Sequence, residues 1–291
     1  MEEPTGISYT QSMPWPHPSW RNAEIFWIWH YQFLQDNGYQ LCPKFHPNWK
    51  PKWKTDDDNP PIMDAAHIKD KKLVTLKKVS RTNFSYKVDL ALFLTSPQLS
   101  DNPKNHCVPI YEVLQSPCEP DVQIMAMPHL HEIYSPDFDT VGKFLDEFHQ
   151  IFDGMEFMHQ NFVAHRLVSL SFQDITILNM MLDPSRLYPK VHFFVSHITC
   201  TQCWPQYYLI DFGSSHQYDP EKLPFNVSVI AGDRSAAEFV EHDHPPLHFL
   251  LPLVDDMTQD DPSLWPTISE VVTCFTKLCN SLMKSQKRLQ T

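Results

Sequence analysis

Glycine is scarce in this sequence, with 6 residues among 291. Loops that cradle phosphates with their backbone need several glycines at fixed spacing, so composition nearly excludes such a loop. Apolar runs are also short, because none approaches the roughly 18 to 20 residues that a membrane-spanning helix needs. The formal charge of -12 argues against general binding of nucleic acids or anionic lipids. The sequence therefore predicts neither a membrane nor a nucleic-acid partner.

The cysteines form no pattern that indicates disulfide bonds or secretion. All 7 are scattered, their number is odd, and the first residues lack a basic segment followed by an apolar core. Cys200 and Cys203 form a lone C-x-x-C pair, and His242, His244 and His248 lie close together in the sequence. Both signals are weak for a metal site, because a second ligand pair is missing. We expect a protein of a reducing compartment, in the cytoplasm, with the nucleus left open.

What the sequence does contain is ample material for a core, since 42% of the residues are hydrophobic. Residues 1–59 are rich in proline and tryptophan, with one expected helix at 23–35 and an extended strap at 43–61. The pattern then changes to short strands around one helix, which predicts a small β-rich lobe. The expected elements are strands at 62–68, 73–79, 105–115 and 122–130 and a helix at 85–96.

The second half of the chain has a helical pattern. Apolar residues between 140 and 159 follow the i, i+3, i+4, i+7 spacing of a helix that is buried on one side. A final helix with the same spacing is expected at 267–282, and the segment "YYLIDFG" predicts a strand that ends at an acid and a glycine. These elements predict an α+β protein with a mainly helical second lobe.

The order of the elements and motifs along the chain is that of a protein kinase. A small β-rich lobe and a long helix come first, followed by His-Arg, an Asp five residues before an Asn, and a later Asp-Phe-Gly. The phrases "KNHCVPIYEVLQ", "VAHR", "NMMLDP", "YYLIDFG" and "DDPSLWPT" resemble those of a protein-kinase-like family abundant in mushroom-forming fungi, over about residues 20–285. The resemblance implies a bilobal protein-kinase fold and ATP-dependent phosphoryl transfer to a protein Ser or Thr hydroxyl.

The resemblance also implies roles for residues that would bind ATP and magnesium. Lys77 in "VTLK" takes the place of the lysine that binds the phosphates. Asn179 and Asp211 take the places of the magnesium ligands, while Met127 would guard the adenine pocket and the N–H of Leu130 would donate to adenine. The plain alternatives are a solvated lysine pair on a strand for Lys77 and an ordinary strand-end acid for Asp211.

The catalytic loop that the resemblance implies is interrupted. Asp174 would be the catalytic base, held in place by His165 and Arg166. In protein kinases this Asp follows His-Arg directly, but here Leu167–Gln173 lies between Arg166 and Asp174. Asp174 and Asn179 keep their spacing, so the pattern indicates an insertion. A misplacement of about 1 Å can cost roughly a hundredfold in rate, so we expect impaired transfer.

Other departures point the same way. A glycine-rich loop before residue 62 is absent, and Trp265 stands where an arginine would pair with Glu238. The interval between them is short for the two helices of a kinase. The resemblance therefore implies that the central buried helix of a kinase has no counterpart at 239–256, and we expect exposed apolar surface. An alternative to the insertion is that Leu167 replaces the catalytic Asp in place, which leaves the Asn spacing unexplained.

These observations predict four parts and one main function. The parts are an N-terminal extension at 1–59, a kinase-like N-lobe and hinge at 60–130, a kinase-like C-lobe at 131–285 and a tail at 286–291. The expected function is that of a protein kinase domain with impaired transfer, with ATP and Mg²⁺ as cofactors and a protein as substrate. The alternative is a non-catalytic pseudokinase that serves as a nucleotide-binding or protein-interaction scaffold.

Overall fold

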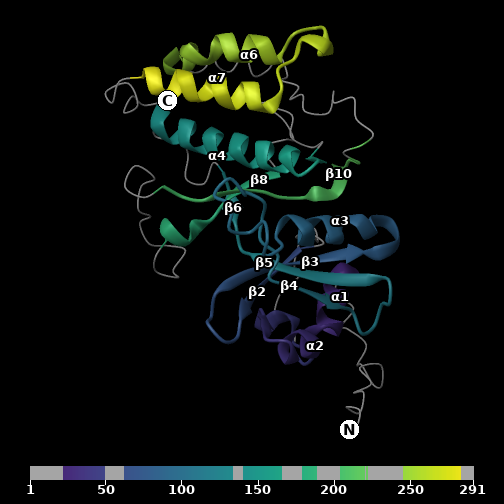
Figure 1. The fold of residues 1–291 in the computed structure, drawn as a ribbon. Helices are drawn as coiled ribbons and strands as arrows, with labels where there is room; N and C mark the ends of the chain where they lie inside the picture. Colours follow the sequence, from purple (N-terminus) through teal and green to yellow (C-terminus); the bar gives the residue numbers. More distant parts are fainter. Residues whose placement is uncertain are drawn as a thin grey trace. The chain divides into compact units, whose positions relative to one another are not determined.

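A computed structural model of the chain describes residues 22–49, 62–133, 140–165, 179–188, 204–219, 221 and 245–282. Its α-helices and antiparallel sheets make an α+β protein (Figure 1). The chain divides into two compact units, each described by itself. Unit 1 contains Met1–Val88 and Pro109–His129, and unit 2 contains Asp89–Val108 and Leu130–Thr291. None of the helices in the described residues is long and apolar enough to cross a membrane.

Unit 1 is built on a five-stranded sheet in the order β1-β2-β3-β5-β4, with every neighbouring pair antiparallel. The strands are β1 (Tyr39–Leu41), β2 (Ile62–His67), β3 (Leu73–Ser80), β4 (Glu112–Gln115) and β5 (Val122–Pro128). The β2–β3 hairpin confirms the strands predicted on both sides of a charged turn. β4 is shorter than the predicted strand at 105–115, because His106 and Val108 form backbone hydrogen bonds with Leu209 instead.

Two short helices, α1 (Asn22–Trp29) and α2 (Tyr31–Asp36), form one hydrophobic core with the sheet. Trp27 is 1% exposed and Leu34 is completely buried. The strand residues in this core alternate along β3 and β5, as expected for side chains on one face of a sheet: Val74, Leu76, Val122, Ile124 and Ala126. The tryptophan-rich N-terminal region thus supplies part of the core of unit 1.

The helix predicted at 23–35 is divided at His30, which corrects the prediction of one continuous element. The buried imidazole lies 2.7 Å from Oγ of Ser116, while its other nitrogen contacts the backbone of α1. No helical period reveals such a contact with a residue far along the chain. The start of the predicted strap, Pro43–Phe45, forms the short 3₁₀ helix η1 rather than an extended chain. Residues 50–61 of that strap lie outside the described residues.

Helix α3 (Arg81–Leu94) begins earlier than the predicted 85–96. Its first turn is held by the carboxylate of Asp121, which accepts hydrogen bonds from the backbone N–H of Thr82 at 2.8 Å and from the Thr82 hydroxyl. Oγ of Ser80 donates to the same carboxylate at 2.6 Å. A carboxylate is a favoured partner for the unpaired N–H groups of a first turn, so a residue from another segment sets this helix start.

Helices α4 (Val141–Gln160) and α7 (Ile268–Ser281) form the centre of unit 2 and confirm two predicted helices. The apolar spacing of about 3.6 residues predicted both, because it aligns one stripe of each helix for burial. The two helices pack against each other, as Figure 1 shows, and the rings of Phe152 and Phe275 meet at a centroid distance of 5.1 Å.

A further helix, α6 (Leu251–Met257), follows the 3₁₀ helix η7 (Pro245–Leu250). The sequence predicted no element for this short stretch and indicated only that the central kinase helix has no counterpart at 239–256. Pro252 lies in the first turn of α6, where its missing N–H needs no partner, so this proline is compatible with a helix start. The buried side chains of α6 are Leu253, Val254 and Met257.

Two small antiparallel sheets complete unit 2. One has the order β6-β8-β9, and the other pairs β7 with β10. The strands are β6 (His131–Glu132), β7 (Val163–Ala164), β8 (Met180–Leu182), β9 (Tyr207–Leu209) and β10 (His216–Gln217). The remaining 3₁₀ helices are η3 (Pro184–Arg186), η4 (Phe212–Ser214) and η8 (Pro262–Leu264). β9 confirms the strand predicted in "YYLIDFG".

Candidate functional site

Three of the predicted site residues meet around the backbone of Ile210 in unit 2. The N–H of Ile210 donates to the carbonyl of Asn179 at 2.9 Å, which extends the β8–β9 ladder by one residue. The carbonyl of Ile210 accepts a hydrogen bond from Nε2 of His165, also at 2.9 Å. Asp211 is the next residue in the chain. His165, Asn179 and Asp211, which are far apart in the sequence, are thus neighbours in the fold.

Asp211 has a left-handed backbone, with φ of 54° and ψ of 71°. This region is uncommon for residues other than glycine, but Asp tolerates it better than most. Oδ1 of Asp211 accepts a hydrogen bond from the N–H of Gly213 at 3.2 Å, which starts the 3₁₀ helix η4. After this turn the ring of Phe212 is buried against that of His165, with the ring centroids 5.5 Å apart.

His165 is almost completely buried, and this decides its charge. Burial lowers the pKa of His165 to about 4, although the Ile210 carbonyl and the Asp211 charge act in the opposite direction. Nε2 carries the proton because a carbonyl can only accept, and the buried Nδ1 has no hydrogen-bond partner among the described residues. Oγ of Ser215 donates to the backbone carbonyl of His165 at 3.1 Å. A neutral imidazole therefore links the segment after β7 to the loop after β9.

Asn179 immediately precedes β8 and Asp211 comes shortly after β9, and both lie beyond the same end of this antiparallel pair because Met180 is opposite Leu209. Carboxylate and amide oxygens are ligands that Mg²⁺ accepts, so these two side chains fit the predicted ion. The part of the chain that the structure describes contains no group of three or more His, Cys, Asp and Glu residues that could hold a metal. The other predicted residues of this loop, Arg166 and Asp174, lie outside the described residues, as do Cys200, Cys203, His242 and His244.

The predicted phosphate-binding residue, Lys77, lies on β3 in unit 1. Met125 is directly opposite Lys77 in the β3–β5 pair, and Met127 is opposite Thr75. Because side chains alternate along a strand, these four share the face of the sheet away from α1 and α2. Lys78 points the other way, with Nζ 4.0 Å from the ring centroid of Phe26 in α1. Leu130, predicted to bind adenine, is buried in unit 2.

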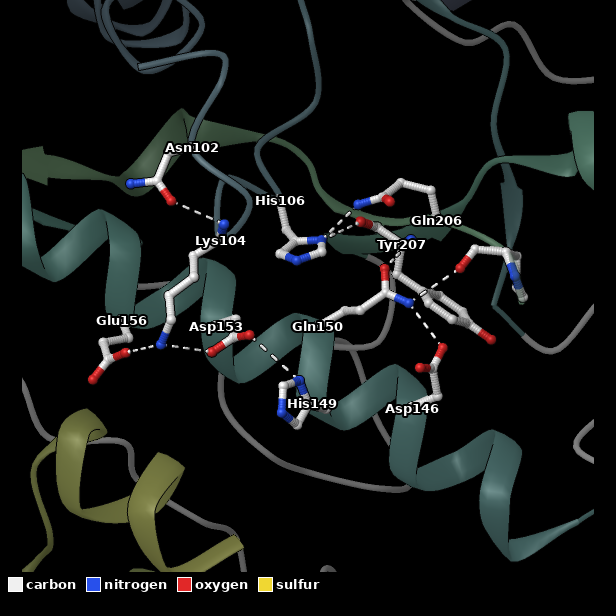
Figure 2. A network of polar contacts seen from close by, with 11 residues as sticks. Asn102, Lys104, His106, Asp146, His149, Gln150, Asp153, Glu156, Gln206 and Tyr207 are labelled. Atoms are coloured by element: carbon white, nitrogen blue, oxygen red, sulfur yellow. Dashed lines mark hydrogen bonds and ion pairs between the residues drawn. The ribbon is translucent and has the colours of Figure 1, made fainter. Parts of the chain in front are cut away.

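A polar network in unit 2 that the sequence did not predict fixes β9 on α4. Figure 2 shows Nζ of Lys104 between two acids of α4, at 3.0 Å from Asp153 and 2.6 Å from Glu156. The backbone N–H of Leu209 donates to the carbonyl of His106 at 2.7 Å. The segment that contains Lys104 and His106 is thereby bound to both α4 and β9.

Gln150 on α4 joins the same network (Figure 2). Its side-chain oxygen accepts from the N–H of Tyr207 at 3.0 Å, and its amide nitrogen donates to the carbonyl of Pro205 at 3.1 Å. Gly154 lies one turn further, and a Cβ at this position would be 2.8 Å from Cβ of His106. The sequence signal for these contacts was "KNHC", which contributed to the family resemblance without revealing a role.

A comparison with models of protein families gives no match, and no curated protein is significantly similar to the chain in sequence. The resemblance to a protein-kinase-like family therefore rests on the phrases quoted from the sequence.

Proposed function

We propose that this chain is a protein-kinase-like protein with a bilobal fold, similar to the family abundant in mushroom-forming fungi. It binds Mg-ATP, and its transfer of phosphate to a protein Ser or Thr is impaired by the insertion Leu167–Gln173. The observation that carries this proposal is the meeting of His165, Asn179 and Asp211 around Ile210. A kinase needs these residue types together, because phosphoryl transfer depends on magnesium ligands beside an ordered catalytic loop.

The roles follow from the chemistry of the side chains. Lys77 would bind the phosphates. Asn179 and Asp211 would hold a magnesium ion, which would supply positive charge to the phosphate oxygens. His165 positions the loop through its bond to the Ile210 carbonyl, because a neutral imidazole can donate one hydrogen bond without adding charge beside Asp211. Asp174 is the base that accepts the proton of the substrate hydroxyl.

Binding of Mg-ATP is tested with Asp211→Asn, which keeps the size of the side chain and removes its charge. We expect Mg-ATP to raise the melting temperature of the wild type and to have no such effect on Asp211→Asn. Asp256→Asn, an exposed acid on α6, is the matched control and should behave as the wild type does. Equal melting shifts in all three proteins would contradict the proposed magnesium site.

Impaired transfer is tested by deleting Leu167–Gln173, which restores the sequence "VAHRDITILN". With labelled ATP and a general protein substrate, the deletion variant should incorporate at least about tenfold more phosphate, because Asp174 returns to its position after Arg166. Adding Asp174→Asn to the deletion should abolish the gain. The non-catalytic alternative predicts Mg-ATP binding with no transfer before or after the deletion.

A further inference from the structure

Three polar side chains form a cluster on one face of the unit 1 sheet: Asp64 on β2, Thr75 on β3 and His129 just after β5. Nδ1 of His129 lies 3.3 Å from Oδ1 of Asp64 and 3.3 Å from Oγ1 of Thr75. Asp64 and Thr75 are directly opposite each other in the β2–β3 pair, so their side chains leave the sheet on the same face. The side chain of His129 is 19% exposed and covers this part of the face.

The cluster lies beside the proposed phosphate-binding residue. Lys77 follows Thr75 by two positions, so it shares the face and is displaced along β3 by about 6.5 Å. Met127, expected to guard the adenine pocket, is directly opposite Thr75, whereas Lys77 is opposite Met125. If the phosphates of a nucleotide are at Lys77 and its base is near Met127, the base lies over the row that contains Asp64, Thr75 and Met127. His129 contacts two residues of that row, Asp64 and Thr75.

We propose that the Asp64–Thr75–His129 cluster covers the place of the nucleobase, so that the site recognises the Mg-bound polyphosphate and admits a base only when His129 moves aside. His129 is then a specificity-determining residue that lowers affinity for the base. This inference rests on the proposed function, since it takes Lys77 as the phosphate-binding residue.

The physical reason is competition for the same surface. A purine ring binds to a flat apolar surface, and here it must first separate His129 from both Asp64 and Thr75. Nδ1 of His129 is shared by two oxygens at 3.3 Å each, so the two contacts together are worth about one hydrogen bond and correspond to a loss of up to about tenfold in affinity. A polyphosphate that lacks a base needs only the surface around Lys77 and is unaffected by His129.

The experiment compares three proteins by calorimetric titration with Mg-ATP and with Mg-tripolyphosphate. His129→Ala should bind Mg-ATP up to about tenfold more tightly than the wild type does, with unchanged affinity for tripolyphosphate. His67→Ala is the matched control, because Nδ1 of His67, at the end of β2, also pairs with an aspartate at 2.8 Å. That aspartate, Asp70, lies in the turn between β2 and β3, outside the cluster. It should leave both affinities unchanged. Asp64→Asn, which keeps its shape, should give a smaller gain for Mg-ATP and serves if His129→Ala does not fold.

The outcomes separate this inference from the proposed function. Unchanged or weaker binding of Mg-ATP by His129→Ala, with tripolyphosphate still bound, would overturn the role of the cluster and leave the phosphate site intact. A wild type that binds Mg-ATP more than tenfold more tightly than tripolyphosphate would do the same. If no protein binds either probe, the proposed function fails, and the inference fails with it.

Discussion

Glu147 and Glu156 lie on the same helix, α4, and are 0% and 8% exposed, yet their surroundings differ. Burial alone would raise the pKa of Glu156, but hydrogen bonds from Lys104 and Ser269 hold it below its ordinary value. Neither carboxylate oxygen of Glu147 has a hydrogen-bond partner among the described residues. Burial and the nearby charge of Asp146 raise the pKa of Glu147 well above its ordinary value, against the opposing charge of Lys143.

The difference shows which half of α4 supports the candidate site. Gln150 bonds to Tyr207 in β9, and Gly154 lies close to Leu209 in the same strand. Lys104, in the segment that pairs with β9, forms an ion pair with Glu156. β9 leads directly to Asp211. The part of α4 from Gln150 onward, which contacts β9 and the residues before it, contains the paired carboxylate of Glu156. The part before Gln150 contains Glu147, whose buried carboxylate has no hydrogen-bond partner among the described residues. The predictions below test this contrast.

The largest expected effect is a loss of stability in acid. Burial lowers the pKa of His159 and of His165 to about 4 from the ordinary value of 6.5. The unfolded chain therefore binds more protons between these values, so stability that is present above pH 6.5 is lost as the pH falls toward 4. Each group contributes on the order of 3 kcal/mol. Urea denaturation between pH 7 and 4 measures the loss, and His159→Gln should reduce it. An acid loss that this variant leaves unchanged would contradict the assignment.

Lys104→Ala should cost about 2 kcal/mol, because it leaves Asp153 and Glu156 without their cation. Loss of one partner from a fully buried pair costs more, about 3 to 5 kcal/mol, but the Lys104 side chain is 40% exposed and water screens the charge. Lys72→Ala is the matched control, since Lys72 pairs with Asp70 at 3.9 Å and is 77% exposed. It should cost less than about 1 kcal/mol. Equal urea midpoints for both variants would show that the paired half of α4 is not special.

Gly154→Ala should cost about 1 to 2 kcal/mol, although alanine favours a helix. The new methyl group would be 2.8 Å from Cβ of His106 and 3.1 Å from Cδ1 of Leu209. Overpacking of this kind costs about 1 to 3 kcal/mol, while the gain in helix propensity is about 1 kcal/mol. The free energy of unfolding measures the effect. In a His106→Gly background the same substitution should stabilise instead, and a stabilising effect in the wild type would contradict the close approach.

The sequence best predicted those helices and strands whose apolar residues repeat at a regular spacing within the element itself. α4, α7 and the β2–β3 hairpin were predictable because 3.6- and 2-residue periods of apolar side chains need no knowledge of partners. The division at His30 and the early start of α3 were not predictable, since Ser116 and Asp121 cause them from other parts of the chain. α6 was not predicted because it is only seven residues long, too short for a 3.6-residue apolar period to show clearly.

The candidate site was predictable as residue types but not as an arrangement. Asn179 and Asp211 stood out because an Asn after an acid and an Asp-Phe-Gly are specific in combination. Their meeting depends on the register of β8 with β9, which spacing cannot supply. Lys143 and Glu147 have charged side chains that a helical pattern assigns to solvent. They are buried because α4 packs against α7 and also against β9, so burial is not limited to one stripe.

The smallest expected change in stability comes from replacing each of the two buried glutamates, one at a time, by glutamine. The pKa of Glu147 is higher in the folded chain than in the unfolded chain, where it is about 4.5. The unfolded chain therefore loses this proton first, and the stability of the wild type falls as the pH rises above about 4.5. Glu147→Gln cannot lose a proton and should be more stable than the wild type at pH 8, by about 1 kcal/mol, with no gain at pH 4.

Glu156→Gln should have the opposite sign. The pKa of Glu156 is lowered in the folded chain, so its contribution is present above the ordinary carboxyl pKa and is lost as the pH falls through the folded value. The variant should be less stable than the wild type at pH 8, and the difference should shrink in acid. Urea midpoints of both variants at pH 4 and pH 8 decide the matter. If the two substitutions shift stability in the same direction at pH 8, Glu147 and Glu156 do not differ in the way that their hydrogen bonds and neighbouring charges indicate.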